Sequence, residues 1–155
     1  MTAYTLVHVV LSLVGIGSGL VVLLGLLAGK RHNASTAVFL ATTAATSLTG
    51  YGFPFDHLLP SHIVGAISLV VLALAIYARY GRHLTGGWRT VYVIGATTAL
   101  YLNVFVLVVQ SFMKVPVLHD LAPTQSEPPF AIAQLAVLVL FIVLGTLAVR
   151  GSRKA

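Results

Sequence analysis

The hydrophobic pattern divides the chain into five long apolar runs separated by short polar links. The runs cover residues 4–28, 34–53, 61–80, 90–113 and 129–149. A helix needs about 20 apolar residues to cross the hydrocarbon core of a bilayer. The runs are too long for the roughly 9–11-residue strands of a membrane barrel. The pattern therefore predicts an all-α integral membrane bundle of five transmembrane helices, forming a single domain over residues 1–155.

The composition supports a membrane protein rather than a soluble domain. Apolar residues make up 58% of the chain and charged residues only 8%, against about 25% charged residues in soluble proteins. The lack of cysteine excludes disulfides, iron–sulfur clusters and thiol catalysis. The least apolar run is 34–53, which carries several threonines and serines. We expect it to cross the membrane together with the other four runs.

Basic residues gather at one set of run ends, and this predicts the orientation of the bundle. With five spans, the following fall on one side: Lys30, Arg31, Arg79, Arg82, Arg89, Arg150, Arg153 and Lys154. Lys114 falls on the other side, together with Asp56, Asp120 and Glu127. Cytoplasmic loops carry an excess of Lys and Arg. We therefore expect an extracytoplasmic amino terminus and a cytoplasmic carboxyl terminus.

The net charge of +6 belongs to these run ends and not to a nucleic-acid-binding surface. Basic groups at span ends act as topology determinants and contact anionic lipid headgroups. The expected partner is therefore the lipid bilayer, with a homo-oligomer or a larger membrane complex as further options, and no nucleic acid is expected.

Polar side chains within the predicted spans concentrate in the extracytoplasmic half. They are His8, Ser12, Thr46, Ser47, Thr49, Tyr51, His62, Gln110, Ser111 and Gln134, with Asn103 nearer the middle. A polar group inside a span is costly and usually faces the bundle interior or a water-filled cavity. The distribution therefore predicts a polar pocket that opens to the extracytoplasmic side.

Two histidines in this half suggest a redox cofactor. His8 shares a helical stripe with Ser12, Gly15 and Gly19, and His62 is followed by small residues on its own face. Imidazoles from two spans could hold a six-coordinate b-type haem. In this hypothesis His8 and His62 are the ligands, and the pocket is lined by Ser12, Asn103, Gln110 and Gln134. The alternative is that both histidines are simply hydrated or bonded to a neighbouring helix.

A transition-metal site is a second hypothesis. Its candidate ligands are His57, His62, His119 and Asp56, all on the extracytoplasmic side. Imidazole and carboxylate ligands suit zinc, copper or iron. However, His57 and His62 are five residues apart and straddle Pro60, so they do not share one face of a helix. Asp56 could instead accept a hydrogen bond from a ligand histidine.

Three short stretches, "FPF" (53–55), "LYLNVFVLVVQ" (100–110) and "APTQSEPPF" (122–130), resemble a group of small multi-span bacterial inner-membrane proteins. The resemblance covers most of the second to fifth runs. It implies a multi-pass protein of the bacterial inner (plasma) membrane. It carries no activity, ligand or site residue to this chain.

The leading functional hypothesis is a small membrane protein whose extracytoplasmic polar pocket binds a redox cofactor or a small ligand. The alternatives are a non-catalytic subunit or scaffold of a larger membrane complex, or a metal-binding protein. No spacing singles out a Ser–His pair, so the sequence assigns no catalytic residue and leaves open whether the protein is an enzyme.

Overall fold

The computed structural model describes residues 1–154, which form helices joined by short links. The helices are α1 (Ala3–Leu27), α2 (Asn33–Gly50), α3 (Pro60–Ile76), the π-helix η1 (Tyr77–Gly81), α4 (Trp88–Lys114), α5 (Pro116–Leu121) and α6 (Pro128–Ser152). No strand occurs in this part of the chain. The prediction of an all-helical fold is confirmed.

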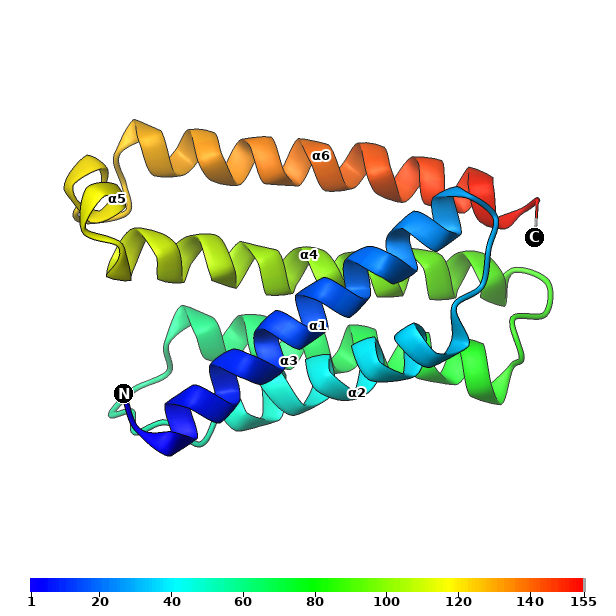
Figure 1. Ribbon diagram of the computed structural model, residues 1–155, viewed down its shortest axis with the longest axis horizontal. Helices are drawn as coiled ribbons and strands as arrows, with labels where there is room; N and C mark the ends of the chain where they lie inside the picture. The colour runs from blue at the N-terminus through cyan, green and yellow to red at the C-terminus, as the bar shows by residue number, and fades with distance from the viewer. Residues whose placement is uncertain (155) are drawn as a thin grey trace.

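The long helices run side by side in alternating directions (Figure 1). α1, α3 and α6 run one way and α2 and α4 run back, so the two chain termini lie at opposite ends of the bundle. We call the end that holds Asp56, Asp120 and Glu127 the acidic end. The other end, which holds the α1–α2 link and the η1–α4 link, is the basic end. Helix α4 packs against α1, α2, α3 and α6 and is the centre of the bundle.

Four helical segments are long and apolar enough to cross a membrane: Ala3–Leu27, Pro60–Gly81, Trp88–Lys114 and Pro128–Ser152. Helix α2 is not among them because its threonines and serines lower its hydropathy. Large apolar side chains cover much of the outside of the bundle, for example Leu24, Val70 and Ile132. Such a surface is expected where lipid tails, rather than water, surround the helices. The chain is therefore a multi-pass membrane protein.

In the middle of the bundle, apolar side chains pack tightly against a glycine of α1. Phe39 of α2 and Leu100 of α4 are buried, and both lie against Gly19 of α1. A Cβ atom added at Gly19 would lie 2.7 Å from Leu100 Cδ1 and 2.9 Å from the Phe39 ring. Only glycine therefore lets these three helices approach so closely. We call these three residues the apolar layer.

The turn from η1 to α4 has an unusual backbone. Helix α3 continues directly into the π-helix, and His83 and Leu84 follow with φ angles of 49° and 57°. The Leu84 N–H donates to the Ala78 carbonyl oxygen over 3.0 Å, and the Leu84 side chain packs against the core. Left-handed backbone is disfavoured for residues other than glycine. These contacts therefore offset the strain and hold the turn, which positions Arg79 and Arg89.

Candidate functional site

A cavity of about 100 Å³ lies between α1, α2, α3 and α4 in the half of the bundle nearer the acidic end. Its lining residues are His8, Ser12, Thr46, Ser47, Gly50, Ser61, Val64, Gly65, Ser68, Leu102, Asn103 and Val106. Most of these side chains carry a hydroxyl, an imidazole or an amide, and none of those described is a Lys, Arg, Asp or Glu. We call this space the neutral cavity.

His8 is held in one orientation by α2. Its Nδ1 atom lies 2.7 Å from Thr49 Oγ1, and its ring meets Phe53 edge-on with centroids 5.0 Å apart. The Thr49 hydroxyl donates its only proton to the Ala45 carbonyl oxygen over 2.7 Å. Thr49 must therefore accept from His8, which places the imidazole proton on Nδ1. In the neutral imidazole, the Nε2 atom of His8 then carries a lone pair that can accept a hydrogen bond or bind a metal.

Polar atoms that lack partners lie at the inner end of the neutral cavity, which we call its floor: Asn103 lines it and Thr43 lies close behind, beside Gly15. The Asn103 side chain is 8% exposed, and its Oδ1 atom lies 3.5 Å from the Ser12 hydroxyl. Within residues 1–154, neither Asn103 Nδ2 nor the buried Thr43 hydroxyl finds a hydrogen-bond partner. Leaving a buried polar group unsatisfied costs about 1–3 kcal/mol. Such groups are normally bonded to water or to a ligand.

Gly15 makes room for these unpartnered atoms. A Cβ atom added there would lie 3.1 Å from Thr43 Oγ1 and 3.2 Å from Asn103 Nδ2. The glycine therefore keeps α1 close to α2 and α4 without filling the space between the two polar groups. Within the stripe of small residues that follows His8, Gly15 is therefore the residue that leaves space around Thr43 and Asn103.

The hydroxyls on the walls supply further hydrogen-bonding groups. The Ser47 hydroxyl donates to Ser68 Oγ over 3.3 Å, which leaves the Ser68 proton available. Thr46 is engaged with its own helix, since its hydroxyl donates to the Thr42 carbonyl oxygen over 2.8 Å. The cavity thus offers donors from Asn103 and Ser68 and an acceptor at His8. This mixture suits an uncharged molecule that carries both acceptor and donor groups, or a carbonyl alone.

His62 does not line the neutral cavity. Its side chain is 6% exposed, and its Nδ1 atom accepts a hydrogen bond from the Leu59 N–H over 2.9 Å. The imidazole centroid lies 4.1 Å from that of Phe55 and 5.4 Å from that of Tyr51. Helix α3 starts at Pro60, so His62 serves to cap its amino end. The structure therefore does not bring His8 and His62 together as facing ligands in this cavity.

The two glutamines of the sequence hypothesis also lie outside the neutral cavity. Gln134 of α6 donates from Nε2 to the Phe105 carbonyl oxygen over 3.2 Å and so joins α6 to α4. Gln110 lies near the acidic end of α4, half-buried. The remaining predicted pocket residues, His8, Ser12 and Asn103, do line the same cavity.

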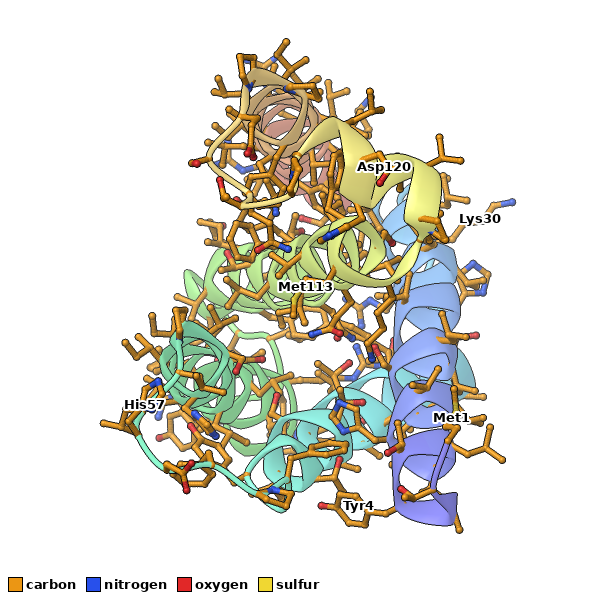
Figure 2. The ribbon with its side chains drawn as sticks, turned by 90° about the vertical axis from the view of Figure 1, so that its left-hand side faces the viewer. Met1, Tyr4, Lys30, His57, Met113 and Asp120 are labelled. Atoms are coloured by element: carbon orange, nitrogen blue, oxygen red, sulfur yellow. The ribbon has the colours of Figure 1, made fainter. Side chains whose placement is uncertain are left out.

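The candidate metal ligands do not gather. Across residues 1–154, no group of three or more His, Cys, Asp or Glu side chains is placed to hold a metal ion. Asp56 and His57 are exposed on the α2–α3 link, and His119 is exposed on α5. Figure 2, which views the acidic end, shows His57 and Asp120 on opposite sides of the bundle. This separation gives the metal hypothesis no structural support.

The sequence hypothesis missed the cavity residues Ser61 and Ser68, and it missed Thr43, whose unpartnered hydroxyl lies beside Gly15. A signal for the two serines was present, because Ser61 and Ser68 are seven residues apart and so share one face of a helix. Thr43 carried no such signal, since hydroxyls recur throughout α2 and only the packing shows which one is buried and unpartnered.

No protein-family model, curated protein or solved structure matches the chain.

Proposed function

We propose that the protein crosses the bacterial inner membrane five times and binds a small uncharged polar molecule in the neutral cavity, from the extracytoplasmic side. Five long helices that alternate in direction support this topology (Figure 1). With 18 residues and a rise of about 1.5 Å per residue, α2 is about as long as the roughly 30 Å hydrocarbon core is thick. The concentration of Lys and Arg at the basic end supports a cytoplasmic carboxyl terminus.

The main support for the proposed ligand is the side-chain amide nitrogen of Asn103, which has no hydrogen-bond partner in the described residues. It lies on the floor of a cavity whose other polar groups are hydroxyls and one neutral imidazole. An amide N–H pair without a partner calls for an acceptor such as a carbonyl or hydroxyl oxygen. The absence of charge in the described lining favours an uncharged ligand, since an ion placed there would remain uncompensated.

The volume limits the size of the group that enters. An apolar cavity of about 150 Å³ admits benzene, and the neutral cavity, at about 100 Å³, is smaller, so we expect one polar group and part of a small ring to enter while the rest of the ring stays at the mouth. A porphyrin is far larger. Haem ligation by His8 and His62 stays a prediction from the sequence, and the absence of a Soret band after haem is supplied would count against it.

Two ring compounds of matched size test the proposed function. Cyclohexanone carries a carbonyl acceptor and cyclohexane does not, so we expect cyclohexanone alone to bind. Saturation-transfer NMR on the protein in dodecyl maltoside micelles measures the contact of each probe with the protein. The Asn103→Leu variant should lose the cyclohexanone signal because it removes the donor from the floor.

Gln134→Leu is the matched control for this experiment. It also removes a side-chain amide that is partly unpartnered, but from the α4–α6 contact outside the cavity. We expect Gln134→Leu to bind cyclohexanone as the wild type does. Equal binding of the two ring compounds, or equal loss in both variants, would contradict the proposed function.

The alternative of a non-catalytic subunit of a larger membrane complex also stays a prediction. Copurification of a stoichiometric partner under mild solubilisation would favour it. A homogeneous monomer or homodimer that still binds cyclohexanone would favour ligand binding in the neutral cavity instead.

A further inference from the structure

A second cavity lies at the basic end of the bundle, where the α1–α2 link meets η1, α4 and the end of α6. Its volume is about 20 Å³. Its polar lining residues are Lys30, Arg31, His32, Thr36, Arg79, Arg89, Tyr92 and Ser152. We call this space the cationic cavity. It shares no residue with the neutral cavity.

The chain places no acidic side chain beside these cations. Its three acids are Asp56, Asp120 and Glu127, and all of them lie at the acidic end (Figure 1). The positive charge of Lys30, Arg31 and Arg79 is therefore not neutralised by a carboxylate side chain of the protein. A membrane end with this charge attracts anions.

The amino termini of two helices add to the positive electrostatic potential at the basic end. Helices α2 and α4 both begin at the basic end, and neither has an acidic residue in its first turn or a hydrogen bond from a capping side chain in the described residues. Instead, Arg31 and His32 directly precede α2, and Arg89 is the second residue of α4. A helix amino terminus favours an anion and disfavours a cation. Lys30, Arg31 and the amino terminus of α2 therefore place positive charge together at the basic end, where an anion is favoured.

The buried hydroxyl of Tyr92 is an independent sign of a ligand. Tyr92 lines the cationic cavity and is 2% exposed. Its hydroxyl lies near Thr36 and Arg79 and interacts weakly with both side chains, but neither contact has the geometry of a hydrogen bond, so within residues 1–154 the hydroxyl has no hydrogen-bond partner. Thr36 donates its own proton to the His32 carbonyl oxygen over 2.7 Å. A hydroxyl donor is thus available where the cations converge.

Arg79 is already fixed in place for such a contact. Its Nη2 atom donates to Asn33 Oδ1 over 2.6 Å, and its guanidinium carbon lies 5.4 Å from the Tyr92 ring centroid and 5.6 Å from that of Tyr80. Because these contacts use only part of its five N–H donors, others remain for a ligand. The π-helix, a feature often found at functional sites, carries Arg79 to this position.

We propose that the cationic cavity binds a phosphate group. The enclosed space admits about one water-sized group, so one phosphate oxygen enters toward the Tyr92 hydroxyl. The remaining oxygens stay at the mouth, where Lys30, Arg31 and Arg79 provide charge-assisted donors. The phosphate is that of an anionic lipid headgroup or a free phosphate ion, since both present the same chemistry to these side chains.

Thermal unfolding in dodecyl maltoside micelles distinguishes the two sources. The added probes are dihexanoylphosphatidylglycerol, dihexanoylphosphatidylcholine and sodium phosphate, with sodium chloride at equal ionic strength as the reference. We expect phosphatidylglycerol to raise the unfolding temperature and phosphatidylcholine to leave it unchanged, because the choline cation is repelled. Stabilisation by sodium phosphate as well identifies the phosphate group itself as the ligand. No stabilisation beyond that of chloride would overturn the proposal.

Matched variants localise the effect. Lys30→Gln with Arg31→Gln removes two exposed cations of the cavity and should weaken the affinity for the phosphate probe roughly tenfold or more, since two charge-assisted contacts are lost. Arg150→Gln with Arg153→Gln removes two exposed cations at the same end that do not line the cavity. This control should bind the probe as the wild type does. Equal weakening in both double variants would show a general surface-charge effect and overturn the proposal.

Tyr92→Phe separates binding from folding. Removing an unpartnered buried hydroxyl should leave the unfolding temperature without phosphate unchanged or higher. The affinity for the phosphate probe should fall several-fold because one donor is lost. An unchanged affinity would show that no phosphate oxygen reaches Tyr92, which contradicts the proposed geometry. This site is independent of the neutral cavity, so its failure leaves the proposed function intact.

Discussion

The neutral cavity and the cationic cavity are both polar, yet they are built from different groups. The neutral cavity lies among the helices and uses hydroxyls, an amide and an imidazole. The cationic cavity lies at the helix ends and uses Lys and Arg. The difference reflects how deep each cavity lies in the membrane. A charged side chain costs much more free energy within the hydrocarbon region than at the level of the headgroups, whereas a neutral polar group there needs only one or two hydrogen bonds. The chemistry that each cavity can offer a ligand is therefore set by its position in the bundle.

The apolar layer formed by Gly19, Phe39 and Leu100 lies between the two cavities. Gly19→Val should have the largest effect on stability of any single substitution proposed for this chain, because the added atoms would overlap Leu100 and the rigid Phe39 ring. We expect a loss of about 1–3 kcal/mol in the free energy of unfolding, measured by thermal or denaturant unfolding in micelles.

Gly17→Val is the matched control, two residues away on the exposed side of α1. A Cβ atom there would meet nothing within 4 Å, so the change should have little effect on stability. Equal destabilisation by the two substitutions would mean that α1 itself, and not the apolar layer, responds to a β-branched residue.

Asn103→Leu should have a smaller effect on stability and of the opposite sign. The substitution removes a buried amide nitrogen that has no partner, which should raise the free energy of unfolding of the ligand-free protein by about 1 kcal/mol. Thermal unfolding without any probe measures this change. A clear loss of stability would show that the Asn103 amide is hydrogen-bonded to ordered water. The neutral cavity would then hold water when no ligand is bound.

The smallest expected effect concerns Glu127, which lies at the acidic end but outside the neutral cavity. Desolvation is the largest single influence and raises the pKa of its carboxyl, but hydrogen bonds from the Thr124 side chain and from the backbone N–H groups together outweigh it and lower the pKa. Because the folded pKa lies below the unfolded one, the stabilisation is present above the unfolded pKa and is lost as pH falls through the folded pKa.

Amide hydrogen exchange in the link 122–127 should therefore quicken on acidification, after correction for the intrinsic pH dependence of exchange. Glu127→Gln should abolish this change, since it removes the titrating group. The link 51–59 serves as the internal reference. The same pH response in the variant would assign the effect to another group.

Helix positions were largely predictable from the sequence, and the site only in part. Long apolar runs specify helices through their length alone, and each predicted run contains a helix that differs at its ends by a few residues. Short α5 and the π-helix were not predicted, because their backbone depends on neighbouring contacts such as that between Leu84 and Ala78. The four most apolar helices meet the criterion for crossing a membrane, and the crossing of α2 stays a prediction.

For the candidate site, the sequence indicated how deep each polar residue lies along its helix, but it did not indicate in which direction the side chain points. His8, Ser12 and Asn103 share a cavity because all three lie at similar depth on helices that face one another. His62 lies at a similar depth as well, but its imidazole turns back to accept from the Leu59 N–H. Proline at the first position of α3 fixes where that helix starts, and the capping role of His62 follows from this local geometry. Hydropathy carries no information of that kind.

The apolar layer also has an electrical consequence. Phe39 and Leu100 are almost fully buried and lie in the bundle interior between the two polar cavities. A continuous file of water or hydroxyls there would conduct protons down a membrane potential that is worth about 2.3 kcal/mol per charge for each 100 mV. The apolar layer interrupts such a file, because Phe39 and Leu100 place ring and methyl carbons, which neither donate nor accept hydrogen bonds, between the two cavities.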